Sequence, residues 1–399
     1  MKLFLAVMLT IFSSFSGFAI THGNSFQRVD RCIAKPIERL ELGLQAGELL
    51  YNVSADSQDS QATRLRTIFG SFTPSIADVY FGRISPNGLY FVAPYRGEVV
   101  VFDRSGQLIY RGASSGGSGT INWLGNDRIL RLNYTFTGRD SRLRSYFRLS
   151  YYIIDPFARS YIVYQPPYDE YERPFFYAGD RPLELYHLGN TLTYDGRYML
   201  TIGRGAFDFH TQQVIDLENA QIGVPSMTSH RFLVVDYNSF DHIEPTEEQV
   251  HPIQIYDIDT DTLQQIATVT TERLMDVYEN SWSPDEERWA YGLNFGDEIV
   301  FRPISIFDLS TGESTLTCLG RYYHTDSVVI NGTYYGRGAQ SPDFAWSRDS
   351  RYLALQGVLE GEDPDESLGV YIYDTQTSDI YEVYRGRADI IGWMAHPDS

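Results

Sequence analysis

Three aspartates have a spacing that could bring carboxylates to one place. Asp78, Asp276 and Asp389 each lie seven residues before the Ser or His of a turn, in the segments DVYFGRISP, DVYENSWSP and DIIGWMAHP. If these segments are equivalent strands of a repeated fold, the carboxylates lie at corresponding heights and could bind a cation or a cationic ligand. The alternative is structural, because an Asp at the start of a strand commonly accepts hydrogen bonds from backbone N–H groups.

Two acidic segments could bind calcium by their composition but not by their spacing. They are FDHIEPTEEQVH (240–251) and EGEDPDES (360–367), and neither has a diagnostic arrangement of ligands. The nearby triplet Asp257, Asp259 and Asp261 lacks the Gly and the Glu that an EF-hand loop requires. We therefore expect solvated negative charge in these segments, and the sequence predicts no metal and no cofactor.

One short motif has the form of an acyl-transfer nucleophile. Gly112, Ser114 and Gly116 match G-x-S-x-G. The nucleophile elbow needs a helix after it, whereas SSGGSGT leads here into another strand. No P-loop, dinucleotide fingerprint, HExxH or CxxC motif occurs. We therefore expect no acyl-transfer nucleophile at this motif.

The segment 166–187, PPYDEYERPFFYAGDRPLELYH, is the most aromatic insertion in the chain. Its rigid aromatic rings stand beside hydrogen-bonding groups, a combination that suits protein and sugar surfaces. We predict that Tyr168, Tyr171, Arg173 and Phe176 contact a ligand. The alternative is a compact surface loop that packs its own aromatic rings against the fold.

These candidate residues lie between the copies of a repeated unit. The unit is an aromatic-Ser-Pro-Asp turn, an apolar strand, a variable gap and an apolar strand that ends in Phe-Asp or Tyr-Asp. Its clearest copies are WSPDEERWAY from Trp282 with ISIFDLSTGE from Ile304, and WSRDSRYLAL from Trp346 with VYIYDTQTSD from Val370. Asp at the first position of a turn accepts its own backbone N–H groups, so we assign these repeated residues a structural role.

The composition favours strands joined by turns over helices. The chain is 43% hydrophobic and 15% aromatic and contains 33 Gly. Each unit reads as four strands, and four strands make one propeller blade. We therefore predict an all-β fold, a single β-propeller of about seven four-stranded blades. Six units have turn signals in both places, and their second turns follow Asp103, Asp155, Asp216, Asp257, Asp308 and Asp374.

The seventh blade would be divided between the two ends of the chain. Residues 389–399 read as one strand and the start of its turn, and 47–72 could supply the missing strands. Such pairing would close the ring and remove exposed strand edges. We therefore predict a propeller over 47–399 after an N-terminal segment 20–46. The alternative is six blades with a separate N-terminal cap.

The repeats resemble the WD-like propeller repeats of the TolB type, whose core is W-S-P-D-G-x-x-[LI]-A followed by an I-Y-x-x-D strand. The match is close at 282–290 and 346–354, although Glu286 and Ser350 stand where the family usually has Gly. The resemblance implies a propeller fold and often a protein-binding role at the cell envelope, but it fixes no partner. Residues 32–72 also resemble bacterial SH3-like segments, which is an alternative to closure of the ring by these residues.

Residues 1–19 read as a cleaved signal peptide, because Lys2 precedes an apolar run that leads into small residues. The alternative is an uncleaved anchor, but Ser and Thr interrupt the run, and a spanning helix needs about 20 mainly apolar residues. We therefore expect an exported protein, periplasmic or extracellular. In an oxidising compartment Cys32 and Cys318 could form a disulfide; otherwise they are two unpaired thiols.

The formal net charge of -20 argues against nucleic acid and anionic lipid as partners. After the signal, no apolar run is long enough to span a bilayer. We expect a monomer.

The long connections between strands should emerge on one face of the propeller, because strands alternate in direction within a blade. From these connections we predict a non-catalytic exported propeller that binds a protein or a surface glycan through that face. The alternative is a glycan-active hydrolase or lyase that uses carboxylates at the channel mouth as acid and base. The long connections are 133–145, 165–190, 237–252, 319–340 and 357–368.

Overall fold

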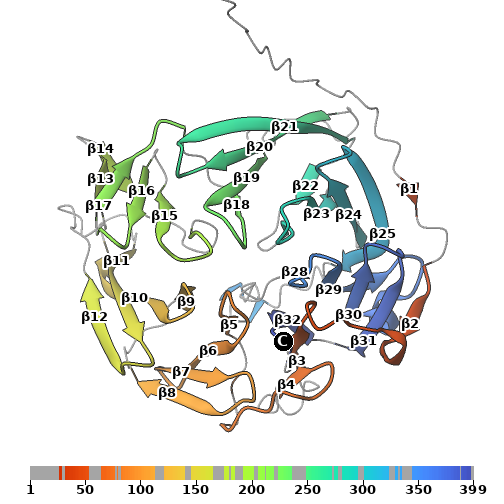
Figure 1. Cartoon of the computed structure of the whole chain (residues 1–399), viewed down its shortest axis with the longest axis horizontal. Coiled ribbons are helices and arrows are strands. Elements are labelled where there is room, and N and C mark those ends of the chain that lie inside the picture. The colour runs from red at the N-terminus through yellow and green to blue at the C-terminus, as the bar shows by residue number, and fades with distance from the viewer. Residues whose placement is uncertain are drawn as a thin grey trace, which may run out of the picture.

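A computed structural model arranges the chain as a ring of antiparallel sheets around a central axis (Figure 1). Within the described residues the helices are η1 (Ile37–Arg39) and α1 (Pro364–Ser367), and no helix there is long and apolar enough to cross a membrane. The structure describes residues 27–28, 32–53, 64–76, 79, 82–112, 121–139, 145–164, 175–178, 181–184, 192–201, 205–211, 213–219, 223–235, 249–271, 274–276, 281–294, 301–322, 329–330, 333–334, 344–386 and 388–396.

Five units of the ring have four antiparallel strands, with the first strand nearest the axis (Figure 1). The first unit consists of β5 (Arg83–Ile84), β6 (Tyr90–Tyr95), β7 (Glu98–Asp103) and β8 (Leu108–Gly112). The second consists of β9 (Ile121–Leu124), β10 (Arg128–Arg139), β11 (Ser145–Asp155) and β12 (Ser160–Tyr164). The third is β18 (Val224–Pro225), β19 (Arg231–Val235), β20 (Gln249–Asp257), β21 (Thr262–Thr271). The fourth consists of β22 (Leu274–Asp276), β23 (Arg288–Asn294), β24 (Phe301–Asp308) and β25 (Glu313–Tyr322). The fifth consists of β28 (Phe344–Trp346), β29 (Tyr352–Leu359), β30 (Gly369–Asp374) and β31 (Ile380–Arg385).

Two further sheets have three strands each. One lies between the units that end at β12 and begin at β18, and an isolated bridge from Leu192 to Met199 continues it toward the axis. Together the sheets form an all-β propeller with five complete blades, and the predicted number of six or seven stays a prediction. The three-stranded sheets are β15 (Tyr198–Thr201), β16 (Gly205–Asp208), β17 (Gln213–Asp216), and β32 (Ala388–Met394), β3 (Glu48–Val53), β4 (Arg64–Thr67).

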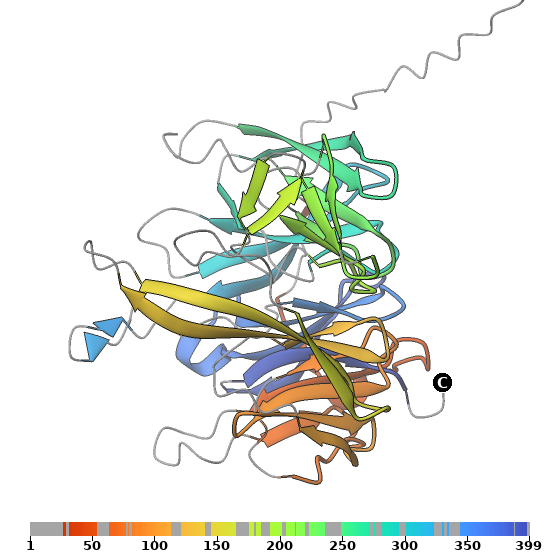
Figure 2. The same cartoon turned by 90° about the vertical axis from the view of Figure 1, so that its left-hand side faces the viewer.

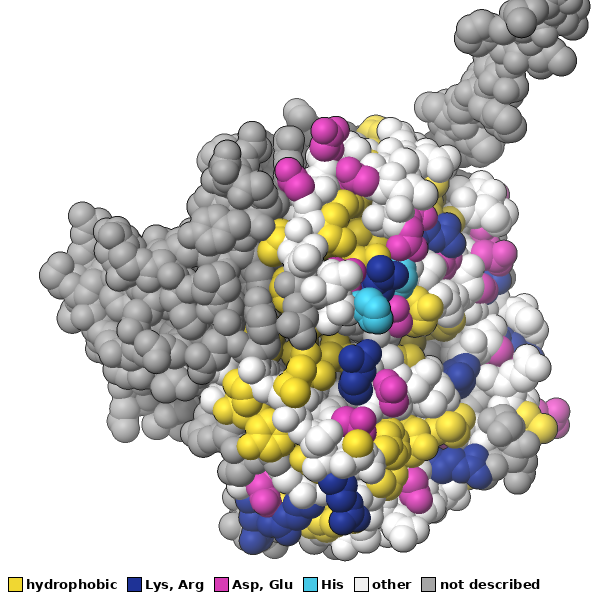
Figure 3. All heavy atoms as spheres, turned by 60° about the vertical axis from the view of Figure 1, so that its left-hand side comes forward, with side chains coloured by type: hydrophobic (Ala, Val, Ile, Leu, Met, Phe, Trp, Pro, Cys, Tyr) yellow, Lys and Arg dark blue, Asp and Glu magenta, His cyan; other side chains and the backbone are white. Residues whose placement is uncertain are grey.

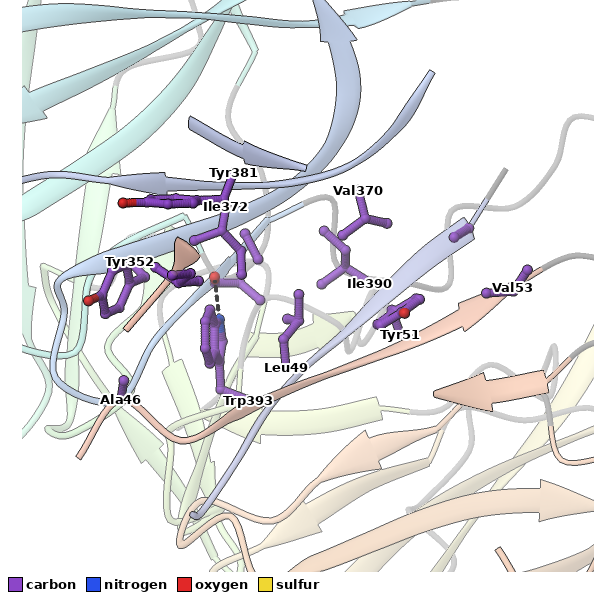
Figure 4. Close-up of a cluster of buried hydrophobic side chains, with 14 residues drawn as sticks. Ala46, Leu49, Tyr51, Val53, Tyr352, Val370, Ile372, Tyr381, Ile390 and Trp393 are labelled. Carbon is purple, nitrogen blue, oxygen red and sulfur yellow. Dashed lines mark hydrogen bonds between the residues drawn. The ribbon is translucent and has the colours of Figure 1, made fainter. Parts of the chain in front are cut away.

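The second of these sheets joins the two ends of the ring. β32 pairs antiparallel with β3, so that Leu49 lies opposite Trp393. Apolar side chains from both strands then pack against the neighbouring unit, where Ile372 of β30 and Tyr352 of β29 belong to the same cluster (Figure 4). The paired strands thus bury their apolar residues against β28–β31.

Tryptophan side chains link adjacent units near the axis. The indole N–H of Trp393 donates to the carbonyl of Ala345 in β28 at 2.8 Å (Figure 4). Trp346 makes the corresponding bond to the carbonyl of Ser281 at 2.9 Å. In the opposite half of the chain, Trp123 donates to the carbonyl of Arg83 at 3.0 Å, and each of these bonds connects an inner strand to the preceding unit.

A recurring Ser-Asp pair shapes the turns between the first and second strands of a unit. Ser283 Oγ donates to Asp285 at 2.5 Å and accepts the N–H of Arg288 at 2.9 Å. Ser347 makes the equivalent two bonds at 2.6 and 2.8 Å. In the second turns, Asp308 accepts the N–H groups of Ser310 and Thr311 and Asp374 accepts that of Gln376, which confirms the structural role assigned to the aspartates at these turns.

One strand boundary expected from the sequence is wrong. The sequence placed the second turn of the third unit after Asp216, but β16 ends at Asp208, and Asp216 is the last residue of β17. Asp208 accepts hydrogen bonds from the backbone N–H groups of His210 and Thr211 at 2.8 and 3.4 Å. The strand end in this unit is therefore AFD at 206–208, because its Asp makes the turn.

The N-terminal segment lies along the outer edge of the ring. β1 (Gln27–Arg28) pairs parallel with β25, and β2 (Ala34–Pro36) pairs parallel with β31. Between them, Cys32 forms a disulfide with Cys318, with the two Cα atoms 5.4 Å apart. Lys35 of β2 also forms an ion pair with Asp379 at 2.6 Å. The segment therefore adds a strand to the edges of two neighbouring units.

Several connections that the sequence presented as long loops contain strands. β10 and β11 extend through most of 133–145, and β26 (Val329–Ile330) pairs with β27 (Thr333–Tyr334) inside 319–340. The β10–β11 and β26–β27 hairpins project on the same side of the ring, at the left of Figure 2. The C-terminal end lies on the opposite side, which we call the turn face because the short turns emerge there.

Candidate functional site

Most of the residues that the sequence predicted to bind a ligand lie outside the described part of the chain. This holds for Asp78, Tyr168, Tyr171 and Arg173. Phe176 lies in β13 (Phe175–Ala178), opposite Leu183 of β14 (Arg181–Glu184). Their contact with a ligand stays a prediction.

The other two aspartates of the predicted carboxylate cluster lie on innermost strands. Asp276 is the last residue of β22 and lies opposite Gly292. Asp389 is the second residue of β32, half-buried, and lies opposite Asn52. Because Asp78 is not described, the structure does not test whether three carboxylates meet, and the cation site stays a prediction.

A cavity of about 200 Å³ lies where the inner strands converge on the turn face. Strands from separate units contribute to it, namely β5, β9, β18, β28 and β32, together with the segment around Leu192. Its walls include Trp123, Trp346 and Trp393. These tryptophans are almost fully buried, and their N–H groups already bond to backbone carbonyls, so they shape the cavity and leave ligand contact to other residues.

The rim of the cavity carries the side chains that a ligand could reach. Tyr194 and Met227 are 37% and 39% exposed, which is unusual for large apolar residues in this chain. Half-buried Asn122 adds an amide group, whereas the hydroxyls of Ser85 and Thr193 are buried and bond within their own turns. An apolar rim with a few hydrogen-bonding groups is the common character of binding pockets.

The charged groups in the described lining are guanidinium groups, and no carboxylate or imidazole lies among them. They belong to Arg83 and Arg348, in a chain whose net charge is -20. Arg348 Nη1 donates to the carbonyl of Pro86 at 3.2 Å, and loss of hydration lowers its pKa below the ordinary value. The described lining is therefore locally positive, and no pair of carboxyl groups lies among its residues.

Contacts between neighbouring turns hold the rim. Glu286 accepts a hydrogen bond from Ser226 at 2.5 Å and also contacts Ser229 and Arg231 of the preceding unit. Ser350 Oγ accepts the N–H of Asp285 at 2.9 Å. Each turn is thereby tied to the turn beside it.

A histidine between two carboxylates forms the most strongly linked of these contacts. His230 Nε2 lies 2.9 Å from Asp195 Oδ2, and His230 Nδ1 lies 2.9 Å from Asp259 Oδ2. The imidazole also contacts the rings of Tyr194 and Tyr198, with centroids 5.7 and 5.1 Å away. Figure 3 shows histidine, acidic and basic side chains gathered on this flank of the ring.

The two carboxylates change the acid–base chemistry of His230. Burial alone would lower the pKa of His230, but hydrogen bonds and charge from Asp195 and Asp259 outweigh burial and raise it above the ordinary value. Burial alone would likewise raise the pKa of Asp195, but hydrogen bonds from the Arg197 N–H, His230 and Thr193 lower it. The cluster therefore favours an imidazolium between two carboxylates.

The triplet that resembles the start of an EF-hand loop has separate protein partners. Asp257 accepts the backbone N–H of Asp259, Asp259 bonds to His230, and Asp261 accepts the hydroxyl of Tyr256 at 3.0 Å. The three carboxylates thus serve three different contacts and do not point into one ligand cage.

Sequence reasoning missed both the cavity and the histidine cluster. The cavity depends on which strands meet at the axis, and no single motif records that. His230 stands in TSHR, the weakest turn of the repeat, and its departure from the Ser-Asp pattern is the one sequence signal that could have pointed to it.

Comparison with known proteins supports the fold alone. No protein-family model and no curated protein matches the sequence. Among solved structures, an oligogalacturonate lyase from Vibrio parahaemolyticus is similar over 86% of this chain and 91% of its own, with 12% identity and a TM-score of 0.50. A putative TolB from Agrobacterium tumefaciens is similar over 88% and 95%, with 10% identity and a TM-score of 0.33.

The β-propeller domain of a protease from Pyrococcus furiosus is similar over 66% of this chain and 70% of its own, with 11% identity and a TM-score of 0.35. The fold is a β-propeller. At such low identity the structural similarity carries no activity across to this chain.

Proposed function

We propose that the protein is an exported, non-catalytic β-propeller with TolB-type repeats that binds a protein or a surface glycan. The observation that supports this most is the cavity at the axis, where separate units contribute a buried tryptophan wall and an exposed rim of Tyr194 and Met227. Ligands commonly bind where several elements converge on a concave, partly apolar surface.

Seven blades account best for the sheets around the ring. The five four-stranded units are joined by the β15–β17 sheet and by the sheet of β32, β3 and β4. In this proposal the bridge at Leu192 marks the inner strand of the sixth blade, and the two ends of the chain share the seventh.

The binding role is favoured over a glycan-active hydrolase by the chemistry of the cavity. Most glycoside hydrolases need two carboxyl groups about 5 to 10 Å apart beside the sugar. The described lining of this cavity contributes guanidinium, hydroxyl and amide groups instead. The long-connection face stays a second predicted contact surface, because most of its residues lie outside the described part of the chain.

Export is supported by the disulfide between Cys32 and Cys318, because disulfides persist mainly in oxidising compartments. The predicted signal peptide, residues 1–19, lies outside the described part of the chain.

Binding can be tested with a variant of the rim and a matched control. Tyr194→Ala combined with Met227→Ala removes two exposed side chains of the cavity, and Tyr161→Ala removes an exposed ring from the outer strand β12. Each protein is used to capture partners from an envelope extract of the source organism and is screened on a glycan array. Captured ligands are then titrated against all three proteins.

We expect a ligand that binds the wild type and Tyr161→Ala equally and binds the rim variant at least about tenfold more weakly, the loss typical of one or two central contact residues. A ligand that binds the rim variant as tightly as the wild type would show that its binding site lies elsewhere. Cleavage of any captured glycan by the wild type would contradict the non-catalytic role.

A further inference from the structure

His230 joins two units of the ring at the rim of the cavity. It precedes β19, its Nδ1 faces Asp259 in the turn between β20 and β21, and its Nε2 faces Asp195 in the turn before β15. The His230 side chain is 15% exposed, whereas the Asp195 and Asp259 side chains are 31% and 54% exposed. The imidazole is therefore the least hydrated member of the cluster.

Both ring nitrogens of His230 face carboxylate oxygens, and this geometry defines the protonation state that fits. Only an imidazolium has an N–H at both nitrogens and can donate to Asp195 and Asp259 together. A neutral ring would turn one nitrogen lone pair toward a carboxylate.

The other groups around the imidazole also have defined partners. Tyr194 and Tyr198 contact the ring, and the guanidinium of Arg197 lies over the ring of Tyr198 at 4.6 Å. Arg197 also pairs with Asp208 of β16 at 3.4 Å. Arg197 is thereby partly neutralised by Asp208, and the cation directly between Asp195 and Asp259 is that of His230.

The cluster connects directly to the cavity through one short turn. Asp195 and Tyr194 are adjacent in the turn 193–196, where Gly196 N–H donates to the Thr193 carbonyl at 2.8 Å. Tyr194 lines the cavity, and its ring also rests against His230. A change at the imidazole is therefore transmitted to a rim residue without any intermediate element.

We propose that His230 is a proton-dependent positioning residue of the cavity, which as an imidazolium joins the turn 193–196 to the neighbouring unit and holds Tyr194 at the rim. Loss of its proton removes one of the two links and lets the turn open. This inference rests on the proposed binding function for its biological meaning, but the link itself exists without any ligand.

The direction of the pH effect follows from the raised pKa of His230. A group whose pKa is higher in the folded state contributes its full stabilisation below the unfolded value, which for His is about 6.5. That contribution is lost as the pH rises through the folded pKa. The rim is therefore closed below about pH 6.5 and opens as the pH rises through the higher pKa that His230 has in the folded protein.

The inference can be tested with nitrogen NMR of labelled histidine and with amide hydrogen exchange of residues 192–198, corrected for the intrinsic effect of pH. His230→Gln removes the imidazolium. His210→Gln is the matched control, because it changes an exposed histidine in the turn after β16. If His230→Gln fails to fold, Asp259→Asn serves as the second variant, since it leaves Asp195 in place and should lower the titration midpoint of His230.

We expect both ring nitrogens of wild-type His230 to be protonated at about pH 6, and opening of 192–198 to increase about tenfold as His230 titrates. His230→Gln should open to the same extent at every pH, and His210→Gln should behave as the wild type. A neutral ring at about pH 6, or exchange of 192–198 that does not respond to the titration, would overturn the inference.

A binding measurement separates this inference from the proposed function. The captured ligand should bind the wild type more weakly above the His230 midpoint and should bind His230→Gln with no such dependence. If exchange responds to pH but the rim variant Tyr194→Ala with Met227→Ala binds normally, the positioning role holds and the proposed binding site is wrong. If the rim variant loses binding but the corrected amide exchange of residues 192–198 does not change with pH, only the inference about His230 is wrong.

Discussion

Glu286 and Ser350 have left-handed backbones, with φ values of 62° and 60°, at the turn position where Gly88 and Gly196 stand in other units. For a residue with a side chain this conformation costs about 1 to 2 kcal/mol. Both side chains are used to contact the preceding turn, through Ser226 and through the N–H of Asp285. The departure from the TolB-type pattern is therefore compensated by contacts that glycine cannot make.

The two positions should respond differently to glycine. Glu286→Gly relieves the backbone but removes a carboxylate that is 7% exposed, accepts hydrogen bonds from Ser226 and Ser229 and pairs with Arg231, so we expect the free energy of unfolding to fall by about 1 to 3 kcal/mol. Ser350→Gly loses one hydrogen bond, and its stability should stay within about 0.5 kcal/mol of wild type. Urea unfolding measures both, and equal stability of the Glu286 variant and the wild type would contradict the compensation.

Asp195 should affect how the stability of the protein changes at acidic pH. Its pKa is lowered in the folded state, so its contribution is present above the unfolded value of about 3.9 and is lost as the pH falls through the folded pKa. Asp195→Asn should therefore destabilise the protein at neutral pH and converge with the wild type in acid, and it should lower the pKa of His230. The free energy of unfolding, measured over a series of pH values, checks this, with Asp127→Asn at an exposed turn as the control. A difference between Asp195→Asn and the wild type that stays the same at every pH would contradict the prediction.

Inner strands are linked by indole hydrogen bonds, and two equivalent tryptophans provide a matched comparison. Trp346 and Trp282 occupy the same position of the repeat and are both buried, but only Trp346 donates to a carbonyl among the described residues. Trp346→Phe should therefore cost about 1 kcal/mol more than Trp282→Phe, because it removes the indole hydrogen bond, while the Ser281 carbonyl keeps the backbone N–H of Ala290. Denaturant unfolding of both variants tests this, and equal losses would mean that packing alone holds these strands.

The N-terminal strands are fastened by the Cys32–Cys318 disulfide. The bond joins residues 286 positions apart, and we expect the double variant Cys32→Ser with Cys318→Ser to lose about 2 to 5 kcal/mol. Pairing of β2 with β31 remains, so limited proteolysis should cut the N-terminal segment first and leave the ring intact. Unchanged resistance of that segment to protease would show that strand pairing suffices without the disulfide.

Individual strands could be predicted well where the repeat is regular. The strand that directly follows the WSPD or WSRD turn and the strand that ends in Phe-Asp or Tyr-Asp correspond to β23 and β24 in one unit, and to β29 and β30 in another. The prediction erred at Asp216 because AFD and VID both resemble a strand end, and only pairing of β16 with β17 separates them.

The all-β propeller fold was predictable because the repeat fixes which connections are short, whereas the number of blades stays a prediction. The candidate site was not, because it depends on contacts between units that are distant in sequence. Arg83 of β5 and Trp393 of β32 line one cavity from opposite ends of the chain. His230 meets its two carboxylates only after neighbouring units pack together.

The claim that the cavity at the axis binds the ligand is tested most directly by site-specific photo-crosslinking. A photoreactive residue replaces Met227 at the rim in one protein and Val250, which is 63% exposed on β20, in another. After illumination with the captured ligand, we expect a crosslink from position 227 and none from position 250. A crosslink from position 250 alone, or equal crosslinking from both, would contradict it.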